Sequence, residues 1–315
     1  MRQFLSDAAT IFLSLSLESL PFVLLGSLLS TVAGIFLTEA RLRRLLPARG
    51  IAGLPAACLL GLVVPLCDCG TFPLARRLLN RGVPASHVAA FLASAPILNP
   101  AVIASTVWAF SDAPGFVPAR IFTGLLAALF AAGFVALLLP LLPAASASPR
   151  QDEEDCEGHA RAHGPKDSAC GCGHHHGDVE PGWKSFPALA ATEFSENLNW
   201  VFLGAAVSSL VQVAVPRTLL LSQGRSSLAA ILGSLGFSWF ISLCSNADAF
   251  VARSFLGPLG PGAALSFMTF GAMLDLKNTF PLLALFPRRF ALGYTIGTFL
   301  ACLLCAFLFR NLGAG

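Results

Sequence analysis

The sequence has few charged residues. Asp, Glu, Lys and Arg make up only 12% of its 315 residues, whereas 55% are hydrophobic, and the mean hydropathy is +0.73. A water-soluble domain of this composition could not cover its apolar side chains with polar ones. The composition therefore predicts a protein that lies in a lipid bilayer. The net charge of +3 is too small to indicate a nucleic-acid partner.

Two kinds of motif are also missing. The sequence contains no Walker motif, so we expect that this chain does not hydrolyse ATP and is not an enzyme. The first apolar segment is far longer than the apolar region of a signal peptide, and no small-x-small cleavage site follows it. We therefore expect this segment to be the first membrane span.

Eight apolar stretches mostly reach the length that a membrane-spanning helix needs. About 17 to 25 residues cross the hydrocarbon core of a bilayer. The sequence thus predicts an all-α polytopic protein of the cell inner (plasma) membrane, with about eight transmembrane helices, four in each half. The stretches lie near residues 8–38, 51–66, 86–110, 116–142, 187–215, 226–243, 262–286 and 290–309.

A cysteine motif occurs twice, each time at the end of an apolar run. A shift of about 177 positions aligns Cys67 with Cys244 and Arg76 with Arg253. The flanking apolar stretches also fall into register, which indicates two homologous halves. The chain then divides into a first transmembrane repeat, a Cys/His-rich acidic linker and a second transmembrane repeat, at residues 1–143, 144–186 and 187–315.

Helix-breaking residues surround the first motif. Pro65 and Pro73 flank its cysteines, and Asn99 and Pro100 interrupt the apolar stretch that follows. In lipid, the freed backbone groups must face protein or a wet cavity. We therefore expect broken, re-entrant segments that bring the cysteines to the interface between the repeats, as in many transporters. If these segments instead cross the membrane, each half gains one span and the repeats become inverted.

Polar residues at such breaks are functional candidates by default. Asp68 and Asn99 lie at the breaks of the first half, and Asp248 and Asp275 lie at those of the second. In a purely structural alternative, Asp248 caps a helix, while Asp275 and Lys277 end one at the membrane interface. The sequence does not decide between these interpretations.

Two arginines recur in register just beyond the cysteine motifs. An unpaired arginine at membrane depth costs about 2.5 kcal/mol or more. We therefore expect Arg76 and Arg253 to pair with carboxylates or helix-end carbonyls, or to bind an anionic group of a substrate. Alternatively, they reach the interface by snorkelling. Other arginines, among them Arg120, are expected in loops between spans, where the positive-inside rule gives no consistent orientation.

Three cysteines lie in the two equivalent breaks: Cys67, Cys69 and Cys244. Thiolates are soft ligands that favour Cu(I), Zn(II) and comparable thiophilic ions. These thiols, with Asp68 and Asn246 beside them, are therefore a candidate transport site. In the alternative, cysteines pack as small buried residues. We favour that role for the cysteines of uninterrupted apolar stretches, which are Cys58, Cys302 and Cys305.

The polar linker is rich in potential metal ligands. Short Cys/His-rich tracts indicate metal binding, because imidazole and thiolate suit zinc and copper alike. Acidic residues nearby would concentrate cations. We expect a labile zinc or copper site rather than a tightly bound cofactor, although a solvated linker with incidental histidines is the alternative. The candidate ligands are Cys156, His159, His163, Cys170, Cys172, His174, His175 and His176.

Several motifs together carry a family resemblance. They are Pro65-Leu66-Cys67-Asp68-Cys69-Gly70-Thr71-Phe72-Pro73, Ala75-Arg76-Arg77, Arg81-Gly82-Val83-Pro84, Ala95-Pro96-Ile97-Leu98-Asn99-Pro100, Ser242-Leu243-Cys244-Ser245 and Gly271-x-Met273-Leu274-Asp275-Leu276-Lys277-Asn278. Over nearly all the chain except the central linker, it resembles the bacterial predicted permeases of the UPF0718 type. Their relatives include exporters of trivalent organoarsenicals and Cu/Zn efflux transporters. The resemblance implies that Cys67, Cys69 and Cys244 match the cysteines of the organoarsenical exporters.

These observations lead to a functional hypothesis. We expect a secondary efflux transporter for a small thiophilic ion, either Cu/Zn or a trivalent arsenical, with a central cysteine-lined site. A metallochaperone or a second copy of the chain is a candidate partner. Proton coupling is the default mechanism, and the candidate proton carriers are Asp68, Asp248, Asp275 and Glu18 or Glu196. Two alternatives remain: a membrane thiol-redox carrier that uses a Cys67/Cys244 pair, and a metal sensor or channel.

Overall fold

The computed structural model describes residues 2–36, 53–63, 66–141, 186–214 and 228–309. Within these ranges every regular element is a helix and no strand occurs, so the expected all-α fold is confirmed. The first half contains α1 (Arg2–Phe36), α3 (Leu54–Val63), α4 (Asp68–Asn80), α5 (Ala85–Leu98), α6 (Pro100–Ala109) and α7 (Phe116–Leu141). The second half contains α8 (Phe186–Ala214), α10 (Leu228–Ile241), α11 (Ser245–Leu259), α12 (Pro261–Met273), α13 (Leu276–Leu285) and α14 (Arg288–Leu308).

Four described helices are long and apolar enough to cross a membrane: α1, α7, α8 and α14. A fifth span results if α5 and α6, which meet at an angle of 45°, are counted as one broken span. These are the spans of a multi-pass membrane protein. The number is smaller than the expected eight because the apolar stretches near residues 86–110 and 262–286 are each split into two shorter helices.

Local backbone features cause the helix breaks. Asn99 leaves the helical conformation after α5, and Pro100 then occupies the first position of α6, where its missing N–H costs nothing. Leu274 and Asp275 are extended between α12 and α13. After α10, Ser242 has a φ of +49°, a region that residues other than glycine rarely adopt. Four short helices, α4, α6, α11 and α13, therefore begin inside the protein rather than at its ends.

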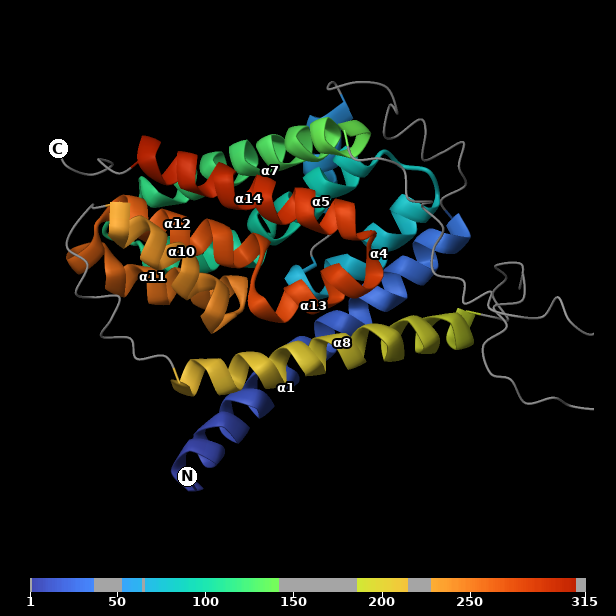
Figure 1. Cartoon of the computed structure of the whole chain (residues 1–315), viewed down its shortest axis with the longest axis horizontal. Helices are drawn as coiled ribbons and strands as arrows, with labels where there is room; N and C mark the ends of the chain where they lie inside the picture. The colour runs from blue at the N-terminus through green and yellow to red at the C-terminus, as the bar shows by residue number, and fades with distance from the viewer. Residues whose placement is uncertain (1, 37–52, 64–65, 142–185, 215–227, 310–315) are drawn as a thin grey trace, which may run out of the picture.

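The long helices enclose the short ones. Figure 1 shows α1 and α8 crossing along one side of the molecule, whereas α7 and α14 lie side by side along the opposite side. The short helices α4 and α13 lie between these two layers, next to α1 and α8 respectively. The largest group of buried apolar side chains comes from α3, α4, α5, α7 and α14. This arrangement places the starts of the short helices in the interior.

Two glycines allow the closest helix contacts. A Cβ atom on Gly26 of α1 would overlap the backbone of Gly70 in the first turn of α4. On α8, a Cβ atom on Gly204 would lie 2.8 Å from the Cα atom of Lys277, in the first turn of α13. Small residues of this kind let membrane helices approach closely. The glycines thus fix where α4 and α13 begin.

The position of Arg120 differs from the expectation. The sequence placed it in a loop before the fourth span, but it lies within α7 and is only 2% exposed. Its guanidinium donates hydrogen bonds to the Thr106 hydroxyl at 2.7 Å and to the carbonyls of Ser245 and Met268 at 3.0 and 3.3 Å. These three acceptors satisfy a cation that would otherwise be too costly to bury. Arg120 therefore gives no information on membrane orientation.

Candidate functional site

Cys67, Asp68 and Cys69 form a compact group at the start of α4. The two sulfur atoms and a carboxylate oxygen all lie within 4.8 Å of one another, and the three side chains are buried. Cys67 has an extended backbone and immediately precedes the helix, so the group occupies its N-terminal turn. The Cys69 thiol donates a hydrogen bond to the Ser19 hydroxyl of α1 at 3.6 Å. Two thiols and one carboxylate with this spacing can coordinate one soft cation.

The Asp68 carboxylate is held by the start of α13. The side-chain amide of Asn278 donates a hydrogen bond to Asp68 Oδ2 at 2.7 Å. The Lys277 ammonium lies 3.4 Å from the same oxygen and 3.6 Å from Asp275 Oδ2. One lysine is thus shared between two buried carboxylates. This network joins the two halves of the chain at the helix breaks.

Asp275 caps helix α13 and also contacts the buried Lys277 ammonium. It precedes α13, and its side chain accepts a hydrogen bond from the Asn278 backbone N–H at 2.6 Å. This is helix capping, a role that the structural alternative had given to Asp248 and not to Asp275. However, Asp275 and Lys277 are 0% and 2% exposed, so this helix begins in the protein interior. The Lys277 ammonium lies between the Asp275 and Asp68 carboxylates and is the cation that both of them contact.

Cys244 approaches the same region from the second half. It immediately precedes α11 and is buried, and the Asn246 side-chain amide donates a hydrogen bond to its sulfur at 3.8 Å. The thiol interacts electrostatically with the carboxylates of Asp68 and Glu18. The structure therefore places the Cys244 thiol, with Asn246 beside it, in the electrostatic surroundings of Asp68.

Asn99 supports the site without belonging to the thiol group. Its side-chain oxygen accepts a hydrogen bond from the Ala101 N–H at 2.9 Å, which caps α6. Its side-chain amide donates to the carbonyl of Leu66 at 3.2 Å, one residue before Cys67. Asn99 thus ties the start of α6 to the segment that carries the thiols.

The two recurring arginines pair with carboxylates, as expected. Arg76 lies 3.2 Å from Glu196 of α8, and both side chains are 41% exposed. Arg253 pairs with Asp112 after α6, and its guanidinium lies 5.7 Å from the centre of the Phe110 ring. These partly exposed pairs link helices, whereas the thiols are buried. Arg76 and Arg253 therefore stand apart from the group around Asp68.

Sequence reasoning left Lys277, Asn278 and Arg120 out of the candidate site. Lys277 and Asn278 belong to a motif that the sequence did single out, and a lysine in an apolar stretch beside Asp275 was the available signal. Arg120 follows the loop between two apolar stretches, so hydropathy alone placed it outside the membrane. Their partners are distant in the sequence, and no local pattern identifies them.

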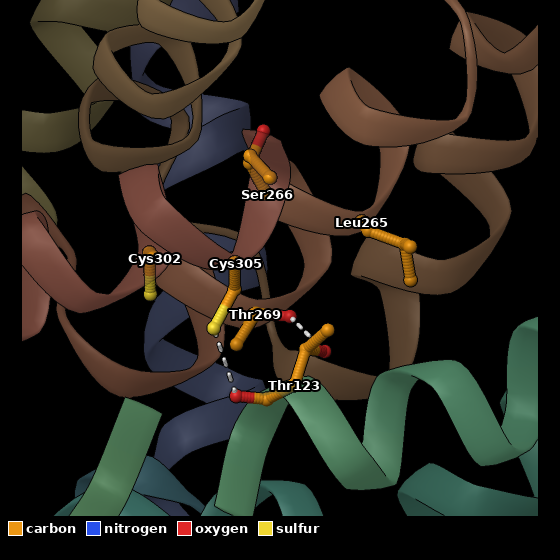
Figure 2. A pocket seen from close by; sticks show the side chains of 7 residues that line it. Thr123, Leu265, Ser266, Thr269, Cys302 and Cys305 are labelled. Atoms are coloured by element: carbon orange, nitrogen blue, oxygen red, sulfur yellow. Dashed lines mark hydrogen bonds between the residues drawn. The ribbon is translucent and has the colours of Figure 1, made fainter. Parts of the chain in front are cut away.

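A narrow crevice lies between α7, α12 and α14 (Figure 2). Its lining includes the hydroxyls of Thr123 and Thr269, which are 3.4 Å apart. The Cys305 thiol donates a hydrogen bond to the Thr123 carbonyl at 3.8 Å. Cys302 and Cys305 are 1% and 3% exposed, in agreement with a packing role in uninterrupted helices. Cys58 on α3 is equally buried.

The linker ligands cannot be placed in this site. The candidates of the central tract lie outside the described residues; they are Cys156, His159, His163, Cys170, Cys172, His174, His175 and His176. Within the described residues, the group at the start of α4 is the only cluster of at least three cysteine, histidine or acidic side chains with ligand atoms this close together.

Comparisons with known proteins agree with this architecture. A family described as "Predicted permease" matches residues 4–311. A Streptococcus mutans protein, whose name describes it as a subunit of a two-component membrane permease complex, is 33% identical over 291 residues, which are 91% of this chain and 89% of the relative. The Bacillus subtilis UPF0718 protein YcgR is 30% identical over 282 residues, 89% of each chain. No solved structure gives a significant match. The chain is a multi-pass protein of the plasma membrane, and it belongs to the predicted-permease family.

Proposed function

We propose that this permease is a secondary efflux transporter for thiophilic metal or metalloid species, either Cu/Zn or trivalent arsenicals. The observation that carries the proposal is the buried group of two thiols and one carboxylate within 4.8 Å. Soft cations prefer such thiolate ligands. Cys67 and Cys69 bind the substrate together with Asp68, which Asn278 and Lys277 hold in place. Cys244 and Asn246 form the opposite side of the transport site.

The electrostatics of the site support a cationic substrate. Lys277 is shared between Asp68 and Asp275, so it cannot fully neutralise both carboxylates. Both groups are buried, where uncompensated charge is costly. A bound cation adds the positive charge that this pair lacks, and the buried surroundings exclude water that would compete for it.

We further propose that the two halves are structural repeats with about eight membrane spans in total. Cys67 and Cys244, which the sequence aligns, each precede a short internal helix. Gly26 and Gly204 lie on the first helix of each half, and each packs against the first turn of a short helix. Transporters commonly form substrate sites where such halves meet.

Two accessory roles complete the proposal. The polar linker binds zinc or copper and tunes transport without being the transport site, because its Cys/His tract has no counterpart inside either half. A second membrane subunit is the favoured partner, since a relative is named as part of a two-component complex. A metallochaperone or a second copy of the chain would be the other partners to test.

The test measures metal accumulation in cells that lack their own efflux systems. Cells expressing the full chain are given zinc, copper or a trivalent methylarsenical, and cell-associated metal is measured by mass spectrometry. We expect lower accumulation of at least one probe, and we expect Cys67→Ser and Cys69→Ser to abolish this effect. Cys58→Ser is the matched control, because it removes an equally buried thiol on another helix.

The same experiment separates the redox alternative. Unchanged accumulation of all three probes by the intact chain would contradict the efflux function. If, in addition, an oxidation-dependent mobility shift required both Cys67 and Cys244, the thiol-redox carrier would be favoured instead.

A further inference from the structure

A second group of buried polar atoms lies at the start of α11, apart from the Cys67 thiols. Asp248 and Ser245 are one helical turn apart on the same face of α11, and Ser238 lies on the neighbouring helix α10. All three side chains are at most 2% exposed. Among the described residues, Asp248 Oδ2, Ser238 Oγ and Ser245 Oγ have no hydrogen-bond partner. Buried polar groups are nearly always paired, so these oxygens indicate a missing ligand.

Gly271 of α12 packs closely against two of these oxygens. A Cβ atom on this residue would lie 2.6 Å from Ser238 Oγ and 3.1 Å from Asp248 Oδ2. The two oxygens therefore face the same point from α10 and α11, but they do not bond to each other. Any other residue at position 271 would place a carbon atom between them. The glycine thus lets both oxygens lie close to the backbone of α12 in the core.

The charges around this space do not balance. Among the described residues, the buried acidic, lysine and arginine side chains are Asp68, Asp248, Asp275, Arg120 and Lys277, three carboxyl groups against two basic groups. All four other groups act electrostatically on Asp248: Arg120 from α7, Asp68 from α4, and Asp275 and Lys277 from the start of α13. The hydrogen bonds of Arg120 go to Thr106, Ser245 and Met268 rather than to Asp248.

Of the three described buried carboxyl groups, Asp248 is the one that has no ion pair. Lys277 is within ion-pair distance of the other two carboxylates, and none of the described cations lies within 4 Å of the Asp248 carboxylate. A buried carboxylate without an ion pair is costly. Carboxylate and hydroxyl oxygens are the ligands that hard cations prefer, and broken membrane helices commonly hold coupling ions.

We propose that Asp248, Ser238 and Ser245 bind one small univalent cation above Gly271, and that this cation is the coupling ion of the permease. Its chemistry is that of Na⁺ or of a hydrated proton, both of which take oxygen ligands. The site does not include the Cys67 and Cys69 thiols, and Ser245 places it next to Cys244, so coupling ion and thiophilic substrate occupy adjacent places. This part of the inference rests on the proposed efflux function.

The crevice in Figure 2 gives this site a polar neighbour. Thr123 follows Arg120 by one helical turn of α7, and Thr269 follows Met268, whose carbonyl accepts a hydrogen bond from Arg120. The crevice hydroxyls of Thr123, Thr269 and Ser266 therefore lie next to the residues that surround the cation site.

Cation binding is measured on the purified full-length protein. Radioactive sodium binding tests Na⁺, and proton uptake in weakly buffered solution, followed with a pH indicator, tests the proton. We expect one of the two to bind, and we expect Asp248→Asn and Gly271→Ala to abolish binding. Ser238→Ala should weaken it about tenfold, the loss expected for one uncharged ligand. Asp7→Asn, an exposed acidic residue of α1, is the matched control and should bind as the wild type does.

The outcomes are distinguishable. Wild-type protein that binds neither cation, or an Asp248→Asn variant that folds and binds normally, would overturn the proposal. If Asp248→Asn fails to fold, Gly271→Ala and Ser238→Ala decide it by the same criterion.

A transport experiment separates this inference from the proposed function. In proteoliposomes loaded with Zn²⁺ and an indicator, an inward gradient of Na⁺ or of protons should accelerate Zn²⁺ efflux, and Asp248→Asn should remove only that acceleration. Efflux that neither gradient affects would overturn the coupling role while leaving the efflux function intact. If no Zn²⁺ or arsenical leaves under any gradient, the efflux function and the coupling role fail together, and the binding measurements alone decide whether the cation site exists.

Discussion

At the scale of single residues, Lys277 is the cation that two buried carboxylates share. It lies 3.4 Å from one Asp68 oxygen and 3.6 Å from one Asp275 oxygen, in surroundings where all three side chains are at most 4% exposed. Removing one member of a buried ion pair leaves an uncompensated charge, which costs about 3 to 5 kcal/mol. Here one substitution would leave two carboxylates without their cation.

We therefore expect Lys277→Met to lower the thermal unfolding temperature of the purified protein strongly. The additional change Asp275→Asn should recover part of the loss, because it removes one of the two buried negative charges that Lys277→Met leaves without a cation. Arg288→Met, at the exposed start of α14, is the control for loss of a positive charge. Equal unfolding temperatures for Lys277→Met and the wild type would show that the ammonium does not hold the carboxylates.

The residue scale also shows what sequence can and cannot predict. The cysteines at the first break were found from their flanking prolines, and the pairing of Arg76 and Arg253 was expected from the cost of an unpaired arginine in a membrane. The contact between Asp68 and Asn278 spans 210 positions in the chain. Sequence patterns locate each helix break, but they do not state which breaks meet in space.

At the scale of elements, the short helices depend on close backbone contacts with α1 and α8. The first turn of α13 carries Lys277 and Asn278, and it touches α8 at Gly204. Any side chain at that position would push the start of α13 away from α8 and so shift it relative to α4. The contacts that hold Asp68 would then lengthen, although the substituted residue touches none of them.

Gly204→Ala should therefore destabilise the protein by about 1 to 3 kcal/mol, the range for overpacking of a tight contact. Gly236→Ala is a well-matched control, because it lies in helix α10 and its Cβ would meet nothing within 4 Å. The Gly236→Ala control should leave stability unchanged or raise it slightly, since alanine has a higher helix propensity than glycine. Thermal unfolding of both variants tests the prediction, and equal behaviour of the two would contradict it.

At the scale of the whole molecule, two layers of long helices hold a centre of short, broken ones (Figure 1). The all-helical fold and the membrane location follow from composition. The number of spans stays a prediction, since the described residues contain four or five candidate spans and hydropathy counts an apolar stretch once whether or not Asn99 or Asp275 breaks it. The polar linker has no sequence counterpart inside either half, and its proposed role is therefore distinct from that of the transport site.

Deletion of residues 152–178 should leave a protein that folds and exports, because tolerance of change concentrates in polar connecting segments. The deleted protein should bind less zinc or copper when metal content is measured by mass spectrometry. Export must remain sensitive to Cys67→Ser in this background. Complete loss of export on deletion, with the cysteine variants unaffected, would move the transport site to the linker.

The hydrogen bond from Asn99 to the Leu66 carbonyl has a consequence for motion during transport. It joins the start of α6 to the chain immediately before Cys67, so the two helix breaks of the first half are mechanically connected. A displacement that opens the thiols to one side of the membrane must either carry the start of α6 with it or break this bond. Alternating access in this protein is therefore expected to proceed by concerted rotation of α4 and α6, because the hydrogen bonds of Asn99 connect the two helices.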